Sequence, residues 1–422
     1  MKKRVALAYS GGLDTSVAVG WLGAELGYEV IAVAVDVGQD VDFVALRKRA
    51  IAAGAVEVEV VDAREELLTD FAMPTLAANA LYEGRYPLVS ALSRPVIVRH
   101  LVAAARRHGA SAVAHGATGK GNDQVRFEVG TRALAPDLEM LAPVRVWGMT
   151  REETIDYAER HDIVVTVSKD RIYSIDANIW GRAIECGVLE DPWAAPPEDV
   201  FALTVPVATE PVEVTVGFEK GVPVSIDGAR PGLVELVGEL GRVAGSVGFG
   251  RVDMVEGRRV GIKSREIYEC PGALALIMAH ADLEGLTLEH DVAHEKARLE
   301  PRFAELVYDG MWFSPLRQAM SAFMTSTQRC VTGEVRLRFS PGGGAEVVGR
   351  RSPVGLYVYD LATYDAADAF RHEDGEGFVR LFGLGIQTWS ARQGGADQAG
   401  AEQAGTDQAG TDQAGTDQAG AE

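Results

Sequence analysis

A glycine-rich segment near the start of the chain carries the residue types of an anion-binding loop. It consists of Ala8, Tyr9, Ser10, Gly11, Gly12, Leu13, Asp14, Thr15 and Ser16. Its glycines let backbone N–H groups approach an anion closely, its hydroxyls add donors, and the helix expected after it contributes about half a positive charge at its N-terminus. We therefore interpret it as a phosphate-binding loop rather than an ordinary strand-to-helix turn. It is not a P-loop, because no G-K-[ST] follows. Dinucleotide reduction has little support, because no G-x-G-x-x-G occurs.

Asp14 in this segment allows two interpretations. It can face the phosphates and help to place a magnesium ion, a hard cation that prefers oxygen ligands. It can equally be an acidic residue at a helix start that interacts with the helix dipole. The residues alone do not choose between these two roles, and we assign no other side chain as a metal ligand.

A second loop, 115–127, follows an expected strand at 112–115, and ligands of open parallel sheets bind at the carboxyl ends of strands. Thr118, Asn122 and Asp123 offer donors and acceptors suited to the two ends of an amino acid. Arg126 offers a planar guanidinium that can hold a carboxylate. The loop therefore predicts an amino-acid site next to the phosphate loop.

The S-G-G-x-D-[ST] string of the first loop resembles the loop of the ATP pyrophosphatases, and the chain to about residue 390 resembles the argininosuccinate synthases. The segments that carry this second resemblance are AYSGGLDTS at 8–16, YEGRYPL at 82–88, HGATGKGNDQVRFE at 115–128, YSIDANIWGRAIE at 173–185 and IKSREIYECPGA at 262–273.

The resemblance implies a two-step ligation in arginine biosynthesis, with ATP as a substrate and Mg2+ as its counterion. The ureido oxygen of citrulline attacks the α-phosphate of ATP, pyrophosphate leaves, and a citrullyl-adenylate forms. The amine of aspartate then displaces AMP to give argininosuccinate. Positioning and charge stabilisation would supply most of the acceleration, and no residue is assigned as a general acid or base.

The resemblance also implies site residues, motif by motif. The residues implied for ATP are Ala8 to Ser16, Val35 and Gly116; for citrulline, Tyr86, Asn122, Arg126, Ser174, Glu256 and Tyr268; for aspartate, Thr118, Asn122 and Asp123. Two positions depart from relatives. Ala183 stands where many have serine, which puts one citrulline contact in doubt, and Val35 replaces a smaller residue, so its contact should be main-chain. Without the resemblance, Tyr86, Ser174 and Tyr268 would be interpreted as packing or capping residues, and Glu256 as an exposed turn charge.

Strands alternate with helices through the first part of the chain, which predicts a doubly wound parallel sheet (α/β, Rossmann-like, of the PP-loop type). The expected strands are 5–9, 30–35, 56–61, 112–115 and 163–167, and the expected helices 14–26, 42–53, 93–108 and 150–161. Hairpins at 212–226, 252–264 and 332–350, with helices near 233–243, 273–280 and 314–330, predict a second α+β domain.

We therefore divide the chain into four parts. They are 1–170, the nucleotide-binding ATP pyrophosphatase domain; 171–362, the synthetase domain for substrates and multimerisation; 363–395, a C-terminal helical oligomerisation extension expected to be helical over 366–391; and 396–422, an acidic pentapeptide repeat. The repeat lacks the apolar residues needed to offset its ordering entropy, so we expect it to be disordered and without a catalytic role.

Composition limits the partners. The chain has 422 residues, a formal charge of −20 and three scattered cysteines. Such acidity argues against nucleic acid and anionic membranes as partners. No apolar run reaches the roughly 20 residues of a membrane helix, and neither a disulfide framework nor a signal peptide is apparent. We therefore expect a cytoplasmic protein, and the resemblance implies a homotetramer.

Other functions and sites were weighed against this one. His290 and His294 resemble part of H-E-x-x-H but lack its glutamate, so a solvated helix face is favoured. Cys270 has no visible base beside it, so a buried neutral thiol is favoured. The alternative functions are another PP-loop adenylating ligase, such as a tRNA-thiolation or lysidine enzyme, and a nucleotide-binding sensor without catalysis. The former enzymes need a basic RNA-binding surface, and a sensor would not need Glu256 and Tyr268.

Overall fold

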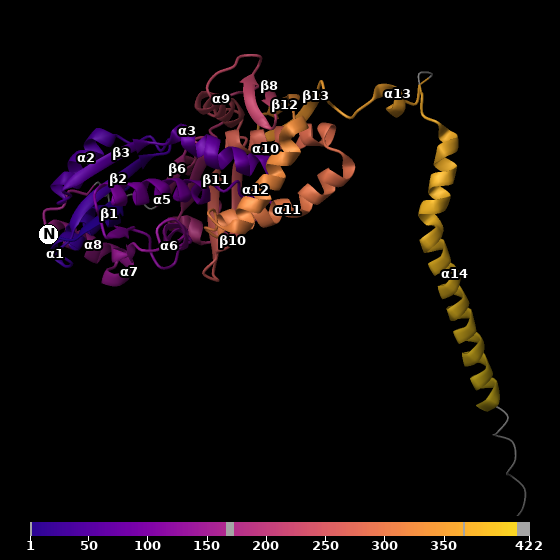
Figure 1. Ribbon diagram of the computed structural model, residues 1–422, viewed down its shortest axis with the longest axis horizontal. Coiled ribbons are helices and arrows are strands. Elements are labelled where there is room, and N and C mark those ends of the chain that lie inside the picture. Colours follow the sequence, from indigo (N-terminus) through magenta and orange to yellow (C-terminus); the bar gives the residue numbers. More distant parts are fainter. Residues whose placement is uncertain (1, 166–172, 366–367, 412–422) are drawn as a thin grey trace, which may run out of the picture. The chain divides into compact units, whose positions relative to one another are not determined.

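The computed structural model describes residues 2–165, 173–365 and 368–411, with side chains as far as residue 394 (Figure 1). The chain forms two compact units, Met1–Leu356 and Tyr357–Glu422. The first unit holds every residue that we single out for chemistry, so its sheets and helices decide the site.

The first sheet is parallel throughout and has the order β3-β2-β1-β4-β5. Its strands are β1 (Arg4–Ala8), β2 (Glu29–Asp36), β3 (Glu57–Asp62), β4 (Ala112–Ala114) and β5 (Glu139–Leu141). The interior of β2 is buried, as expected for a strand covered on both faces. The predicted doubly wound parallel sheet is therefore confirmed.

The edge of this sheet differs from the sequence-based expectation. The expected strand 163–167 is wrong for residues 163–165, which form no strand, and residues 166 and 167 lie outside the described residues. The edge strand is instead β5, which is too short to give a periodic pattern. The apolar side chain of Ile163 packs in the core beside α1 (Leu13–Ala24), which explains the apolar pattern without a strand at this position.

Helices connect these strands, and two of them, α2 and α8, begin at a residue whose side chain caps the helix. They are α2 (Phe43–Ala52), α3 (Arg64–Glu66), a π-helix (Leu67–Ala72), α4 (Met73–Ala77), α5 (Val89–Arg107), α6 (Asp123–Leu134), α7 (Pro143–Trp147) and α8 (Arg151–Arg160). Asp42 accepts the N–H groups of Val44 and Ala45 at 2.9 Å. Thr150 and Glu153 form the expected reciprocal capping box before α8.

The remainder of the first unit contains two antiparallel four-stranded sheets. One has the order β10-β11-β7-β6 and the other β13-β12-β8-β9. The strands are β6 (Ser174–Asn178), β7 (Gly181–Glu185), β8 (Val212–Glu219), β9 (Val222–Ile226), β10 (Arg251–Gly257), β11 (Lys263–Glu269), β12 (Gly333–Ser340) and β13 (Gly344–Arg351). The helices are α9 (Leu233–Gly245), α10 (Pro271–Thr287), α11 (His290–Tyr308) and α12 (Pro315–Thr327), with short 3-10 helices at Gly187–Glu190, Glu198–Val200 and Gln328–Cys330.

The hairpin that carries Glu256 has a longer turn than the sequence suggested. The turn spans residues 258–262 and is closed by the Arg258 N–H, which donates to the Ile262 carbonyl at 2.9 Å. β11 therefore begins at Lys263 rather than at Val260. One hydrophobic cluster includes Val33 of the first sheet and Tyr268 of β11, so the two halves of this unit share a core.

The second unit contains α13 (Tyr359–Ala362) and α14 (His372–Thr411). The structure departs here from the disorder expected from residue 396, because α14 continues to Thr411; residues 412–422 lie outside the described residues. Alanine and glutamine, which recur in every unit of the repeat, are good helix formers, and no proline interrupts them, although each unit also holds one glycine. The expected helical extension at 366–391 begins later, at His372, and residues 366 and 367 also lie outside the described part.

Candidate functional site

The phosphate loop leaves the carboxyl end of β1 and enters α1. The Tyr9 N–H donates to the Val33 carbonyl at 2.9 Å, which extends the pairing of β1 with β2 by one residue. The hydroxyls of Ser10 and Thr15 lie 3.1 Å apart, and Gly11 has a φ of +75°, a conformation that glycine adopts without strain. The expected strand–loop–helix arrangement is therefore present.

This loop lines a cavity of about 1110 Å³. The residues predicted for ATP that line it are Ala8, Tyr9, Ser10, Gly11, Gly12, Thr15, Val35 and Gly116. Leu13 and Ser16 are buried beneath the loop. A Cβ atom on Gly116 would lie 2.7 Å from Cγ2 of Thr15, so the two glycine loops approach each other at a place where no side chain fits. The structure thus brings both loops to one cavity.

Asp14 lies at the start of α1 but is not among the residues that line the cavity. Burial raises the pKa of its carboxyl group, and Arg151 partly opposes that shift. Both interpretations of Asp14 therefore stay predictions.

The sequence analysis missed two arginines that line the same cavity, Arg49 of α2 and Arg94 of α5. Nε of Arg49 is buried and has no hydrogen-bond partner among the described residues. A guanidinium with a free donor beside a phosphate loop is suited to an anionic ligand. Position in space, rather than any motif, identifies these two residues.

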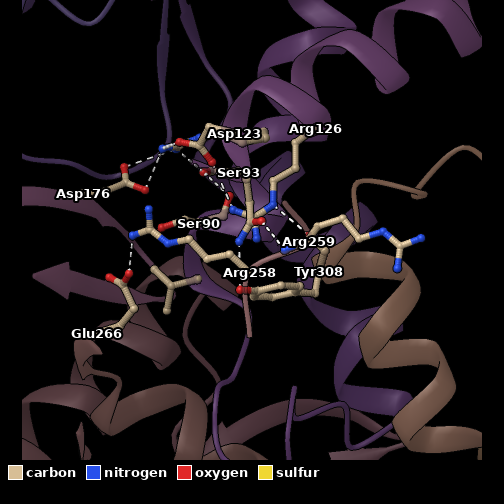
Figure 2. Close-up of polar contacts among 12 residues, drawn as sticks. Ser90, Ser93, Asp123, Arg126, Asp176, Arg258, Arg259, Glu266 and Tyr308 are labelled. Carbon is tan, nitrogen blue, oxygen red and sulfur yellow. Dashed lines mark hydrogen bonds and ion pairs between the residues drawn. The ribbon is translucent and has the colours of Figure 1, made fainter. Parts of the chain in front are cut away.

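Asp123 lies between two guanidinium groups (Figure 2). Its carboxylate is 2.7 Å from Arg94 and 3.0 Å from Arg126, and Arg94 also pairs with Asp176 at 2.9 Å. Burial would raise the pKa of Asp123, but the two arginines outweigh it and lower the pKa to about 2. Asp123 is therefore charged at neutral pH and lines the cavity, as a site for an ammonium group requires. Thr118 is exposed on the same loop, and no hydrogen bond joins it to Asp123.

Glu256 is buried rather than exposed at a turn, with 3% of its surface accessible. The Tyr268 hydroxyl donates to its Oε2 atom at 2.7 Å, and the Tyr308 hydroxyl donates to Oε1. Burial raises the pKa of Glu256, while these two hydroxyls and the nearby Arg126 work in the opposite direction. Its carboxylate is thus held by donors from two elements.

The other residues predicted for citrulline surround this carboxylate, with one exception. Tyr86 stacks on Tyr268 with ring centroids 4.0 Å apart, and Asn122 donates to the Tyr308 hydroxyl at 2.8 Å. Ser174 is exposed on β6, and no hydrogen bond joins it to this group in the described part of the chain. Ala183 pairs with Tyr268 across β7 and β11, so it offers only a methyl group beside the residues predicted for citrulline.

A further charged group lies beside Glu256 and was not foreseen. Arg258 lies 2.6 Å from both Glu185 and Glu266, as Figure 2 shows for Glu266. Burial together with the neighbouring Glu185 raises the pKa of Glu266 to about 8. Sequence spacing gave no signal for this group, because Glu185 on β7 is far in the chain from the hairpin that carries Arg258 and Glu266.

His290 and Cys270, the two other candidate sites, have the structural roles that we favoured for them. His290 is exposed at the start of α11, with 72% of its side chain accessible. Cys270 is fully buried, and burial raises the pKa of its thiol. Neither residue contributes to the cavity.

The fold and this site define a class: a ligase with a HUP-type nucleotide-binding domain joined to a second α+β part. The N-terminal region matches the family model described as the arginosuccinate synthase N-terminal HUP domain over residues 4–164. Residues 173–389 match the arginosuccinate synthase C-terminal domain. A relative from Bacillus pumilus (strain SAFR-032), an argininosuccinate synthase, is 54% identical over 387 residues, covering 90% of this chain and 95% of the relative.

The chain therefore belongs to the argininosuccinate synthase family, and it is a ligase that joins citrulline and aspartate in arginine biosynthesis. A solved structure titled as a predicted subunit of a tRNA methyltransferase from Methanocaldococcus jannaschii DSM covers 37% of this chain and 74% of its own, at 14% identity and a TM-score of 0.26. That likeness is too low to carry any conclusion. No helix in the described ranges is long and apolar enough to cross a membrane.

Proposed function

We propose that the ligation proceeds through a citrullyl-adenylate formed in the cavity between the two glycine loops. The observation that carries this proposal is the cavity of about 1110 Å³, which both the phosphate loop and Asp123 line. An adenylation followed by amine attack needs ATP and both amino acids within reach of one another, because the intermediate forms at the ureido oxygen and is consumed by attack on the ureido carbon bonded to that oxygen.

The ATP site is the phosphate loop, Ala8 to Ser16, together with Val35 and Gly116. Backbone N–H groups of the loop and the N-terminus of α1 face the triphosphate, and the free donor of Arg49 adds positive charge. The described residues hold no cluster of three or more His, Cys, Asp or Glu side chains. The magnesium ion is therefore carried mainly by the ATP phosphates, and Asp14 is the one protein ligand that we name for it.

The amino acids bind on the far side of the loop at 115–127. Asp123, with Thr118 and Asn122, holds aspartate, and its charge suits the substrate ammonium. Citrulline is held by Tyr86, Asn122, Arg126, Ser174, Glu256 and Tyr268, which the structure groups around one buried carboxylate apart from the exposed Ser174. Adenylation turns the ureido oxygen into part of a good leaving group, so the side chains need only to orient the ureido carbon towards the amine, and AMP leaves with that oxygen.

The assembly and location follow from the family resemblance alone. We propose a cytoplasmic homotetramer whose contacts include the second unit, because α14 displays Phe378, Phe382 and Trp389 as exposed apolar side chains.

Pyrophosphate release from ATP tests this proposal. We expect release that depends on citrulline and argininosuccinate formation that depends on aspartate as well. As a control, Gly116→Val should lower both steps together, because its side chain would meet Thr15 where the loops touch. Release without citrulline would favour another adenylating ligase, and no release with both amino acids present would overturn the proposal.

A further inference from the structure

Tyr308, the last residue of α11, contacts more of the proposed citrulline residues than any residue within that group. Its hydroxyl bonds Glu256 and Asn122, and its backbone carbonyl accepts Nε of Arg126 at 3.0 Å. Its ring lies edge-on to Tyr86, with centroids 6.2 Å apart. None of the motifs in the sequence includes this residue, so only the fold brings it to the site.

Hydrogen-bond donors and acceptors fix the direction of this network. The Arg259 N–H donates to Oδ1 of Asn122 at 2.8 Å, so the amide must point Nδ2 at Tyr308 (Figure 2). The Tyr308 oxygen accepts that bond, and its single proton is left for Glu256. Because Arg259 follows Glu256 in the same hairpin, the bonds form a closed ring through three segments of the chain.

Packing keeps the Tyr308 ring in this position. One face stacks on Tyr82 with centroids 3.5 Å apart, and the Arg126 guanidinium lies 5.0 Å from the ring centroid. Gly310, just after α11, has a φ of +76°, and a Cβ atom there would lie 2.8 Å from Cα of Arg126. The end of α11 is therefore pressed against α6, and Tyr308 has little freedom to move.

We propose that Tyr308 is the positioning residue of the citrulline subsite. It holds Glu256, Asn122 and Arg126 in one arrangement, and through Asn122 it links the citrulline side to the aspartate side. This inference rests on the citrulline and aspartate roles proposed above. Both polar atoms of Asn122 already have a protein partner, so one N–H and one lone pair remain for substrates.

A loss of the Tyr308 hydroxyl has a consequence that mere packing would not produce. A hydrogen bond donated to a carboxylate favours its charged form, so removing the donor raises the pKa of Glu256. Binding of the citrulline ammonium needs that charged form, so the acid limb of kcat/KM for citrulline should move to higher pH. The titratable and charged groups that face Glu256 are Tyr82, Tyr86, Arg126, Arg258, Glu266, Tyr268 and Tyr308.

The experiment compares Tyr308→Phe with the wild-type enzyme, using citrulline-dependent pyrophosphate release across pH. A lost hydrogen bond to a charged group corresponds to about a tenfold or larger rise in KM for citrulline. We expect KM for ATP to change by less than about twofold, because none of the residues proposed for ATP forms a hydrogen bond with Tyr308, and we expect the acid limb to shift upward. In a Glu256→Gln background, Tyr308→Phe should produce no such shift.

Two further proteins keep the test decisive. Tyr157→Phe is the matched control. The buried Tyr157 hydroxyl has no partner among the described residues, and Tyr157 lies in the separate hydrophobic cluster that includes residues of α1. Incorporation of 3-fluorotyrosine at 308 keeps ring and hydroxyl but strengthens the donor, so the limb should move to lower pH. If the wild type releases pyrophosphate, and folded Tyr308→Phe keeps the wild-type KM for citrulline and the wild-type acid limb, this inference alone is overturned. If the wild type releases no pyrophosphate, the proposed function is overturned.

Discussion

At the residue scale, two neighbouring guanidinium groups explain why the partly buried carboxyl group of Asp123 can carry a charge. Partial burial would raise the pKa of Asp123, but Arg94 and Arg126 lower it and keep the carboxyl group charged. The same arginines mean that Asp123 has a structural task besides any contact with substrate. A variant that deletes the whole carboxyl group would leave two guanidinium groups without their partner, so an amide of the same size is the better probe.

We predict that Asp123→Asn lowers kcat/KM for aspartate by about 30-fold or more, since losing one partner of a buried charge pair costs about 2 kcal/mol or more. Citrulline-dependent ATP–pyrophosphate exchange should fall by less than about threefold, because Arg126 keeps its bond to the Tyr308 carbonyl. Steady-state kinetics and isotope exchange measure the two steps separately.

Asp176→Asn is the matched control, because Asp176 shares Arg94 with Asp123 but does not contact Arg126. If Asp176→Asn loses aspartate activity to the same degree, the effect runs through Arg94. Equal loss of both steps in Asp123→Asn would contradict the assignment of Asp123 to aspartate.

At the element scale, a buried polar cluster joins α10 and α11 to the segment after α4. Lys296 is 1% exposed and lies 2.8 Å from Glu284, and it also pairs with Glu300. Asn79 donates to both carboxylates, and Gln328 donates to Glu284 at 2.6 Å. A lysine on a helix rich in acids suggests a solvated face, so its burial is a result of tertiary packing.

We predict that Lys296→Met destabilises the protein by about 3–5 kcal/mol, because it leaves the buried carboxylate of Glu284 and the partly buried carboxylate of Glu300 without their cation. Urea unfolding followed by circular dichroism measures this free energy. Lys48→Met, on an exposed position of α2, is the control and should change stability by about 0.5 kcal/mol or less.

A double variant that also carries Glu284→Gln should recover part of the loss, because it removes one of the unpaired charges. If Lys296→Met alone costs less than about 1 kcal/mol, the cluster is not a determinant of stability. Catalytic constants of the folded fraction should stay close to those of the wild type, since Lys296 does not line the cavity.

At the scale of the whole molecule, the acidic charge has little bearing on ATP. The described cavity presents backbone N–H groups, hydroxyls and the guanidinium groups of Arg49 and Arg94, and a helix N-terminus starts at its phosphate loop. A net charge of −20 is therefore compatible with a polyphosphate substrate, although it disfavours polyanionic surfaces as partners.

We predict that truncation after Arg392 leaves kcat and the number of subunits per assembly unchanged, because the removed part lies outside the first unit and follows the apolar side chains of α14. Truncation after Leu356 should reduce the number of subunits per assembly, because it removes those side chains. Light scattering, compared with the mass of each truncated chain, and pyrophosphate release measure both outcomes. A large fall in kcat after Arg392, or an unchanged number of subunits after Leu356, would contradict this.

The sequence by itself predicted the parallel sheet, the positions of the glycine-rich loops at 8–16 and 115–127 after their strands, and the cap of α8. These features depend on local patterns, such as glycines beside hydroxyls or an acid three residues after a cap. Such patterns involve residues that are close in the sequence, so they can be recognised without the fold. The sequence did not predict β5, which is too short to give a periodic pattern. It also did not predict the helix in the pentapeptide repeat, where α14 continues to Thr411.

Only the tertiary structure decided that Glu256 is buried and that Tyr308, Arg94 and Arg49 belong to the site. Those residues lie on α2, α5, α11 and the β10–β11 hairpin, which are far apart in the chain and which only the fold brings into one unit. Burial and charge pairing set their protonation and orientation, and both are properties of neighbours in space, which a sequence motif does not contain.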